Sequence, residues 1–353
     1  MCCSQGFHQV IDYAKKIEEA LVQGEWTTVS ATAEAWVCAI GLNHDPRPYF
    51  VLNVVQLIRG EFGAAWQTHA RALQEPADIE VIKNWVDCLL KEQSDKAHIH
   101  FVAGLFLAQS GQSEQSVIRY KDAIRLDPLA PQPHYFLAQI HERADRMDMA
   151  IKEYREAVKL DLTFTAARTN LGVAYQQQGQ YEMAIPQYRE VIKLNPHDPL
   201  AHANLAGALA EQGKLEAAVV EYKEALKLNE KDAEVHFSLG DIYHQKNRMD
   251  LAIKAYRAAL DADPDFSPAE TALGWILFDG GNKQEAMERF NRALKGNPDD
   301  AQAHFGLARI YAERNKPDTA VELYAKALRL EKDPDKKSTI MSYAFKAGGT
   351  WDL

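Results

Sequence analysis

Apolar residues recur along most of the chain at the three- and four-residue spacing of amphipathic helices, and the same pattern returns at a fixed interval. The stretches Leu171–Pro196, Leu205–Glu230 and Leu239–Pro264 align with one another, and each begins 34 residues after the one before. In each stretch an amphipathic segment is followed by a Gly or Asn turn and then by a second amphipathic segment. The pattern therefore predicts a series of antiparallel helical hairpins.

The same interval extends from Ala97 to Pro334 without insertion or deletion and defines seven repeats. A small residue at the twentieth position lets two helices approach closely, and a ring at the twenty-fourth fills the space between neighbouring repeats. The small residues are Ser116, Ala150, Ala184, Ala218, Ala252, Ala286 and Ala320. The rings are Tyr120, Tyr154, Tyr188, Tyr222, Tyr256, Phe290 and Tyr324. The predicted hairpin turns include Gly179, Gly213, Asn247 and Gly281.

This period and these two columns resemble the tetratricopeptide repeat family. The resemblance implies an all-α fold, a right-handed α-solenoid of antiparallel helical hairpins whose first helices line a concave groove. It covers residues 97–334. We expect residues 1–96 to form an irregular helical region with two degenerate hairpins and an extra helix around Ile79–Gln93. Residues 335–353 are expected to form a capping helix and tail.

The resemblance also implies which positions of each repeat face the groove. At those positions the chain carries Phe237, Trp275, Phe278 and Phe305, which belong to three successive repeats. A contiguous patch of rings is typical of a binding surface, so we predict that these rings contact a partner protein. Phe101 and Tyr135, at the same fifth position as Phe237 and Phe305, are further candidates. The alternative is that the rings pack against adjacent helices or against the C-terminal cap.

Two asparagines, Asn170 and Asn204, stand at the sixth position of successive repeats. In superhelices of this family, asparagines at that place hold the backbone of an extended peptide, because an amide both donates and accepts hydrogen bonds. The alternative is that each amide bonds a neighbouring helix. Readers of chaperone tails in the family use Lys and Asn at the fifth and ninth positions, and this chain has neither there. That class of partner is therefore disfavoured.

Charge and composition narrow the class of partner. The chain has 50 acidic and 40 basic residues and a net charge of -10, which disfavours nucleic acid and anionic lipid. The apolar stretch Phe101–Ala108 is too short to span a bilayer, so no direct membrane insertion is expected. The N-terminal sequence MCCSQGFHQV has no basic region followed by an apolar core. We therefore expect a cytoplasmic protein.

The residue patterns give no indication of a metal, a cofactor or catalysis. Five histidines share the fourth position of different repeats, so one ion cannot collect them, and packing or half-exposed roles are expected. They are His100, His134, His202, His236 and His304. Cys2, Cys3, Cys38 and Cys88 lack CxxC spacing, and Cys38 and Cys88 are expected on apolar helix faces. Lipidation or redox chemistry at Cys2 and Cys3 is the alternative there. The Gly280–Asn282 turn lacks the preceding strand that a phosphate loop requires.

These observations predict a non-catalytic scaffold that binds an extended or helical segment of another protein in the groove. A self-assembling, homo-oligomeric scaffold is one alternative. A targeting or assembly-factor subunit of a larger complex is another.

Overall fold

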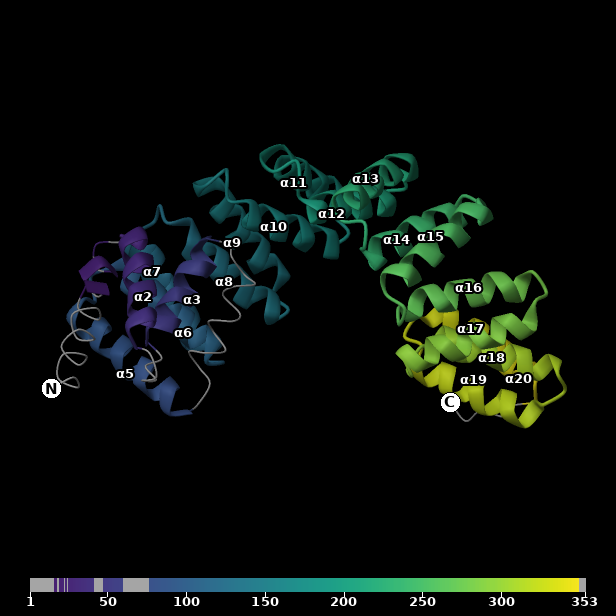
Figure 1. Cartoon of the computed structure of the whole chain (residues 1–353). Coiled ribbons are helices and arrows are strands. Elements are labelled where there is room, and N and C mark those ends of the chain that lie inside the picture. Colours follow the sequence, from purple (N-terminus) through teal and green to yellow (C-terminus); the bar gives the residue numbers. More distant parts are fainter. Residues whose placement is uncertain are drawn as a thin grey trace. The chain divides into compact units, whose positions relative to one another are not determined.

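The computed structural model describes residues 16–17, 19–21, 23, 25–40, 47–59 and 76–348, and this part of the chain consists of helices joined by short turns, without strands (Figure 1). The chain divides into two compact parts, Met1–Leu194 and Asn195–Leu353. We refer to them as the N-terminal body and the C-terminal body. The predicted fold class, an all-α solenoid of helical hairpins, is thus confirmed.

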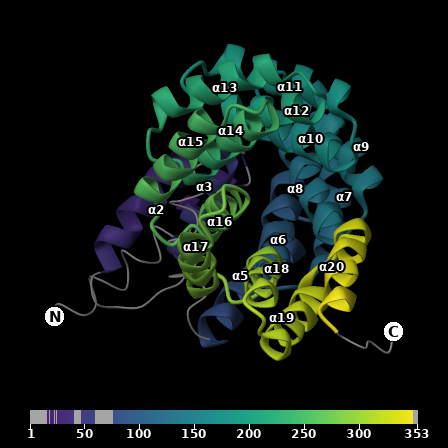
Figure 2. The same ribbon diagram turned by 90° about the vertical axis from the view of Figure 1, so that its right-hand side faces the viewer.

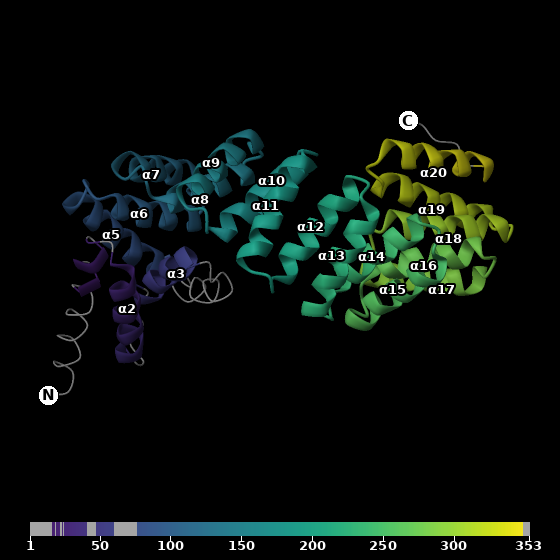
Figure 3. The same ribbon diagram turned by 90° about the horizontal axis from the view of Figure 1, so that it is seen from above.

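In the N-terminal body, residues 16–17, 19–21 and 23 are helical, and helices α2 (Trp26–Ile40), α3 (Arg47–Arg59) and α5 (Pro76–Glu92) come after them. Three hairpins follow, and Figure 3 shows their paired helices side by side. They are α6 (Ala97–Gln109) with α7 (Ser113–Leu126), α8 (Pro131–Arg143) with α9 (Met147–Leu160), and α10 (Thr165–Gln177) with α11 (Tyr181–Leu194).

The C-terminal body contains four hairpins and a last helix. The hairpins are α12 (Pro199–Glu211) with α13 (Leu215–Leu228), α14 (Ala233–Gln245) with α15 (Met249–Ala262), α16 (Ser267–Asp279) with α17 (Lys283–Gly296), and α18 (Ala301–Glu313) with α19 (Pro317–Leu330). Helix α20 (Pro334–Lys346) packs against α19, and Figure 2 shows α18, α19 and α20 next to one another. Ile340 and Ala344 of α20 are buried in a cluster with Phe305 and Tyr324.

The predicted period is confirmed at the level of the backbone. The first helix of each repeat between residues 97 and 334 begins 34 residues after the previous first helix. The residue that reverses the chain inside each hairpin has a positive φ, which Gly and Asn tolerate better than most residues. These residues are Gly111, Asp145, Gly179, Gly213, Asn247, Gly281 and Asn315. Gly281, with φ at 83°, is therefore a hairpin turn, as the sequence predicts.

The two side-chain columns form the core of each hairpin. Every small residue of the twentieth position is fully buried, and the rings of the twenty-fourth position are buried with at most 7% exposure. Phe290 lies against two glycines, Gly274 and Gly306. A Cβ on Gly274 would lie 2.6 Å from Phe290 Cε1, and a Cβ on Gly306 would lie 2.3 Å from Phe290 Cζ. The core therefore depends on close approach of neighbouring first helices.

Only some of the predictions for residues 1–96 can be compared with the structure, because it describes only part of this region. The extra helix expected at Ile79–Gln93 corresponds to α5 (Pro76–Glu92). Cys2, Cys3 and the side chain of Cys38 lie outside the described residues. The prediction for Cys88 is wrong: its side chain is exposed, because α5 buries Trp85 and Leu89 instead. Among the described helices, none has the length and apolarity to cross a bilayer.

Candidate interaction surface

Trp275 of α16 lies at the centre of an aromatic cluster in the C-terminal body. Its ring centroid is 5.7 Å from that of Phe278, 5.4 Å from that of Phe290 and 5.4 Å from that of Phe305. Ring pairs at such distances stabilise one another beyond the area that they bury. Trp275 is only half-buried, whereas the three rings around it are buried. We call Trp275, Phe278, Phe290, Phe305 and Tyr343 the C-terminal aromatic cluster.

Phe278 and Phe305 were predicted to contact a partner, and their burial corrects that prediction. Phe278 is 5% exposed and belongs to the core formed with Phe290. Phe305 is 7% exposed, because Tyr343 of α20 lies against it at 5.6 Å between ring centroids. The alternative reading, packing against adjacent helices and the C-terminal cap, is the one that the structure supports for both rings. They hold Trp275 in place instead of offering contact area themselves.

The guanidinium of Arg309, on α18, lies among the rings of this cluster. Its central carbon is 4.5 Å from the ring centroid of Phe278, 4.6 Å from that of Tyr343 and 5.7 Å from that of Trp275. A guanidinium over aromatic faces is attracted by their quadrupoles. The ammonium of Lys346 lies 5.4 Å from the same Tyr343 ring. Arg309 occupies the ninth position of its repeat, and the repeat pattern does not predict its ring contacts, because Tyr343 stands outside the repeats.

An open cleft of about 580 Å³ adjoins this cluster and is lined by α18, α19, α20 and the turn between the first two. Arg309 and Glu313 come from α18, Tyr324 from α19, and Tyr343 and Lys346 from α20. Burial raises the pKa of Tyr324 to about 12, and the positive charge of Arg309 acts in the opposite direction. The cleft therefore combines aromatic walls with two cations.

Of the three charged side chains that line this cleft, one forms an ion pair within the described residues and two do not. The carboxylate of Glu313 forms an ion pair with Lys283 of the preceding repeat. Within the described residues, neither Arg309 nor Lys346 has a carboxylate partner at ion-pair distance. The cleft consequently has an excess of positive charge, although the chain as a whole carries -10.

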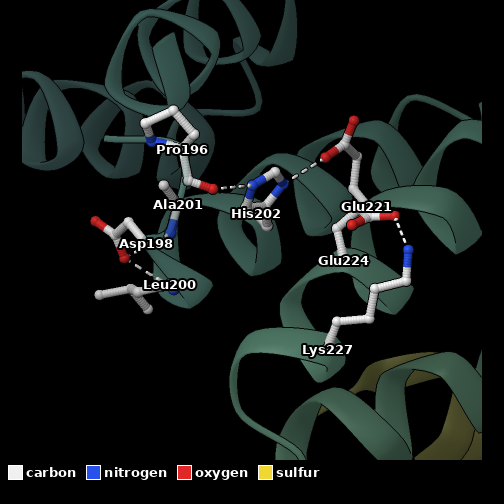
Figure 4. A network of polar contacts seen from close by, with 8 residues as sticks. All are labelled: Pro196, Asp198, Leu200, Ala201, His202, Glu221, Glu224 and Lys227. Atoms are coloured by element: carbon white, nitrogen blue, oxygen red, sulfur yellow. Dashed lines mark hydrogen bonds and ion pairs between the residues drawn. The ribbon is translucent and has the colours of Figure 1, made fainter. Parts of the chain in front are cut away.

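The fourth-position histidines are structural. Figure 4 shows His202 between the carbonyl oxygen of Pro196, 3.3 Å from Nε2, and the carboxylate of Glu221, 2.7 Å from Nδ1. Nε2 makes the equivalent contact with the carbonyl six residues earlier in three other repeats, at His100, His236 and His304. These rings thus connect a first helix to the turn before it. No group of three potential metal ligands occurs in the described part of the chain.

Family models of the tetratricopeptide repeat match residues 101–161, 165–198, 206–247, 233–266 and 271–336. Together they cover the repeats that the helix starts and the buried columns define. The chain belongs to the tetratricopeptide repeat family. A search of the curated proteins found no match.

Solved structures agree with this family and its fold. A tetratricopeptide repeat protein from Parabacteroides merdae has 15% identity and a TM-score of 0.59, over 70% of this chain and 98% of that chain. Yeast Tom70 has 15% identity and a TM-score of 0.53, over 96% of this chain and 88% of that chain. At this identity the similarity concerns the solenoid of helical hairpins and not the ligand.

The predicted groove residues of the tetratricopeptide repeats are not all brought together. Phe237, which is half-buried, lies 5.5 Å from the Tyr256 ring and 5.6 Å from the Phe266 ring. In the described residues it has no ring contact with Trp275. The expected patch therefore divides into a small group around Phe237 and the C-terminal aromatic cluster.

Phe101 and Tyr135 are buried in the N-terminal body, with 4% and 2% exposure. Phe101 packs 5.7 Å from the Phe136 ring, and Tyr135 packs 4.9 Å from the Phe164 ring. Their predicted contact with a partner is thus corrected, because rings of the next helix or turn cover them. The fifth position here serves packing between repeats.

The two asparagines differ in their surroundings. Asn170 donates to the hydroxyl oxygens of Tyr135, at 3.4 Å, and Tyr154, at 3.3 Å. Tyr154 in turn donates to Glu142 at 2.7 Å. The alternative, an amide that bonds a neighbouring helix, therefore fits Asn170. Asn204 lies in the C-terminal body, is half-buried, and makes no side-chain hydrogen bond within the described residues. Its amide donor and acceptor are thus not used by the described residues.

Proposed function

We propose that the protein is a non-catalytic interaction scaffold and that it binds an extended or helical segment of another protein on its C-terminal body. The observation that carries the proposal is the half-buried Trp275, held by three buried rings beside the open cleft. A tryptophan that is fixed but partly exposed is typical of the residues that dominate binding energy at interfaces. Phe237 and Asn204 are secondary contacts in this proposal, because both remain accessible.

Selection from a library of displayed random peptides, with the full chain as bait, tests the proposal. We expect the wild-type chain to enrich related peptides. Trp275→Ala should weaken their binding by about 2 kcal/mol, the size of an interface hot spot. The matched control is Phe345→Ala, which removes a ring of α20 that is 53% exposed and does not line the cleft. Phe345→Ala should leave the affinity unchanged.

Two results would count against the proposal. If the wild-type chain enriches no peptide family, binding of a segment is refuted. If Trp275→Ala and Phe345→Ala affect affinity equally, the site has been placed wrongly. Light scattering over a concentration series tests the competing self-assembly hypothesis, since a scaffold for other proteins should keep the same mass when diluted.

A further inference from the structure

The charge of the cleft, and not only its rings, determines what can bind there. Arg309 and Lys346 both line it, and the carboxylate that lines it, Glu313, is already paired with Lys283. A chain with net charge -10 that concentrates unpaired cations in one cleft attracts anionic groups to that place.

The surroundings of Arg309 indicate which anionic group fits. Aromatic rings contact its guanidinium from two helices, Phe278 from α16 and Tyr343 from α20. Rings interact with the faces of a guanidinium, while its N–H donors lie in its plane. No hydrogen bond joins these donors to any described residue. A planar carboxylate matches them with two parallel hydrogen bonds.

Besides the polar side chains of Glu313 and Asn315, the rest of the cleft lining is mainly apolar. Pro317, Ala312 and the rings of Tyr324 and Tyr343 line it beside the cations. An acidic side chain would thus have an apolar surface next to its own binding place. A neighbouring hydrophobic side chain of the same segment fits that surface.

We propose that this cleft binds an Asp or Glu side chain, followed or preceded by a hydrophobic residue, in an extended segment of a partner protein. Arg309 accepts the carboxylate through its N–H donors, and Lys346 adds charge at the rim. The inference rests on the proposed function and specifies the chemistry of the partner. Nucleic acid fits less well, because the remainder of the acidic chain repels a continuous phosphate backbone.

The peptides enriched by the wild-type chain provide the probe. We expect an acidic residue at a fixed place beside a hydrophobic one. Synthetic versions are amidated, so that the side chain supplies the only carboxylate. Replacing that Glu by Gln should weaken binding about tenfold, as should Arg309→Gln in the protein. Because both changes remove the same contact, combining them should weaken binding about tenfold and not about a hundredfold.

Two further variants separate this contact from general effects. Arg329→Gln removes an exposed arginine of α19 that does not line the cleft, and it should leave affinity unchanged. Lys346→Gln changes an exposed side chain and therefore preserves the fold, and we expect it to weaken binding about two- to fivefold. Circular dichroism checks that Arg309→Gln keeps its helices. If that variant unfolds, the Lys346→Gln result decides, and unchanged binding overturns the inference.

The outcomes distinguish the inference from the proposed function. Enriched peptides that lack acidic residues, or that bind the Arg309→Gln variant equally well, overturn the inference and leave the scaffold function intact. Peptides that bind only after phosphorylation of a serine also overturn it, in favour of phosphate recognition. Failure of the wild-type chain to enrich any peptide refutes the scaffold function itself.

Discussion

Replacing Gly306 by alanine tests the enclosure of Phe290, on which the C-terminal aromatic cluster rests. The added Cβ would lie 2.3, 2.4 and 2.8 Å from three ring atoms of Phe290, all shorter than van der Waals contact. Gly274 also lies against this ring, since a Cβ there would be 2.6 Å from Phe290 Cε1, and the exposure of Phe290 is zero. Relief therefore requires movement of a helix or an unfavourable rotamer.

Two opposing effects set the magnitude. Alanine in the interior of a helix is favoured over glycine by about 0.5–1 kcal/mol. Overpacking of a filled core costs about 1–3 kcal/mol. We expect overpacking to exceed the helical gain, so that Gly306→Ala lowers the free energy of unfolding of the C-terminal body by about 1–2 kcal/mol.

Urea denaturation followed by circular dichroism measures this change. Gly280→Ala is the matched control, because Gly280 is exposed, has φ at -74°, and its added Cβ would meet only two backbone oxygens, at 3.3 and 3.6 Å. It should change stability by no more than about 0.5 kcal/mol. Phe290→Leu replaces the ring by a smaller side chain and so makes room for the methyl group that Gly306→Ala adds. When the two changes are combined, Phe290→Leu should therefore remove most of the cost of Gly306→Ala. A stabilising Gly306→Ala would refute the argument, since helix propensity alone would then explain the result.

Three other predictions concern burial and hydrogen bonding. Phe278→Ala should lower the free energy of unfolding by about 3–5 kcal/mol, measured by denaturation, and a change below about 1 kcal/mol would contradict its burial. Asn170→Ala should cost about 1 kcal/mol in the same assay and Asn204→Ala about half of that or less, because only the first amide bonds buried hydroxyls; equal costs would contradict this difference. Burial raises the pKa of Tyr135 and of Tyr324 to about 12, so their contribution to stability is complete below the ordinary tyrosine pKa of 10.0 and is lost as the pH rises toward about 12. Above pH 10.0, stability should fall by up to about 1.4 kcal/mol per pH unit for each such ring. Because the chain has 14 tyrosines, the tyrosinate absorbance of these two is obtained by subtracting that of the Tyr135→Phe or Tyr324→Phe variant. This difference should appear together with unfolding, and its appearance in the folded state would contradict the burial.

The positions of the helices and turns could be predicted closely from the sequence, because every repeat has the same length. A 34-residue period without insertions assigns each residue a position, and the twentieth and twenty-fourth positions meet the same neighbours in every repeat. Their burial therefore follows from the period. The turns follow too, since a Gly or Asn marks most of them.

The candidate site was harder to predict, because its burial depends on contacts outside the period. Phe305 and Phe237 have the same repeat position, yet Tyr343 of α20 covers Phe305, whereas Phe237 packs against Tyr256. The hydroxyls that engage Asn170 come from Tyr135 and Tyr154, whereas no described residue bonds the amide of Asn204. The position within a repeat indicates which helix face a residue occupies. It does not indicate whether a neighbouring ring covers that residue or a neighbouring hydroxyl forms a hydrogen bond with it.

The rings around Arg309 also change the entropy of binding at the cleft. A free arginine side chain loses up to about 2 kcal/mol of rotamer entropy when it becomes fixed. Here Phe278 and Tyr343 restrict the guanidinium when the chain folds, so that much of this loss belongs to folding and not to association. A ligand then meets an arginine that is already oriented, and a larger share of the hydrogen-bond energy remains as affinity. Phe278, which does not line the cleft, can therefore strengthen binding without contacting the ligand.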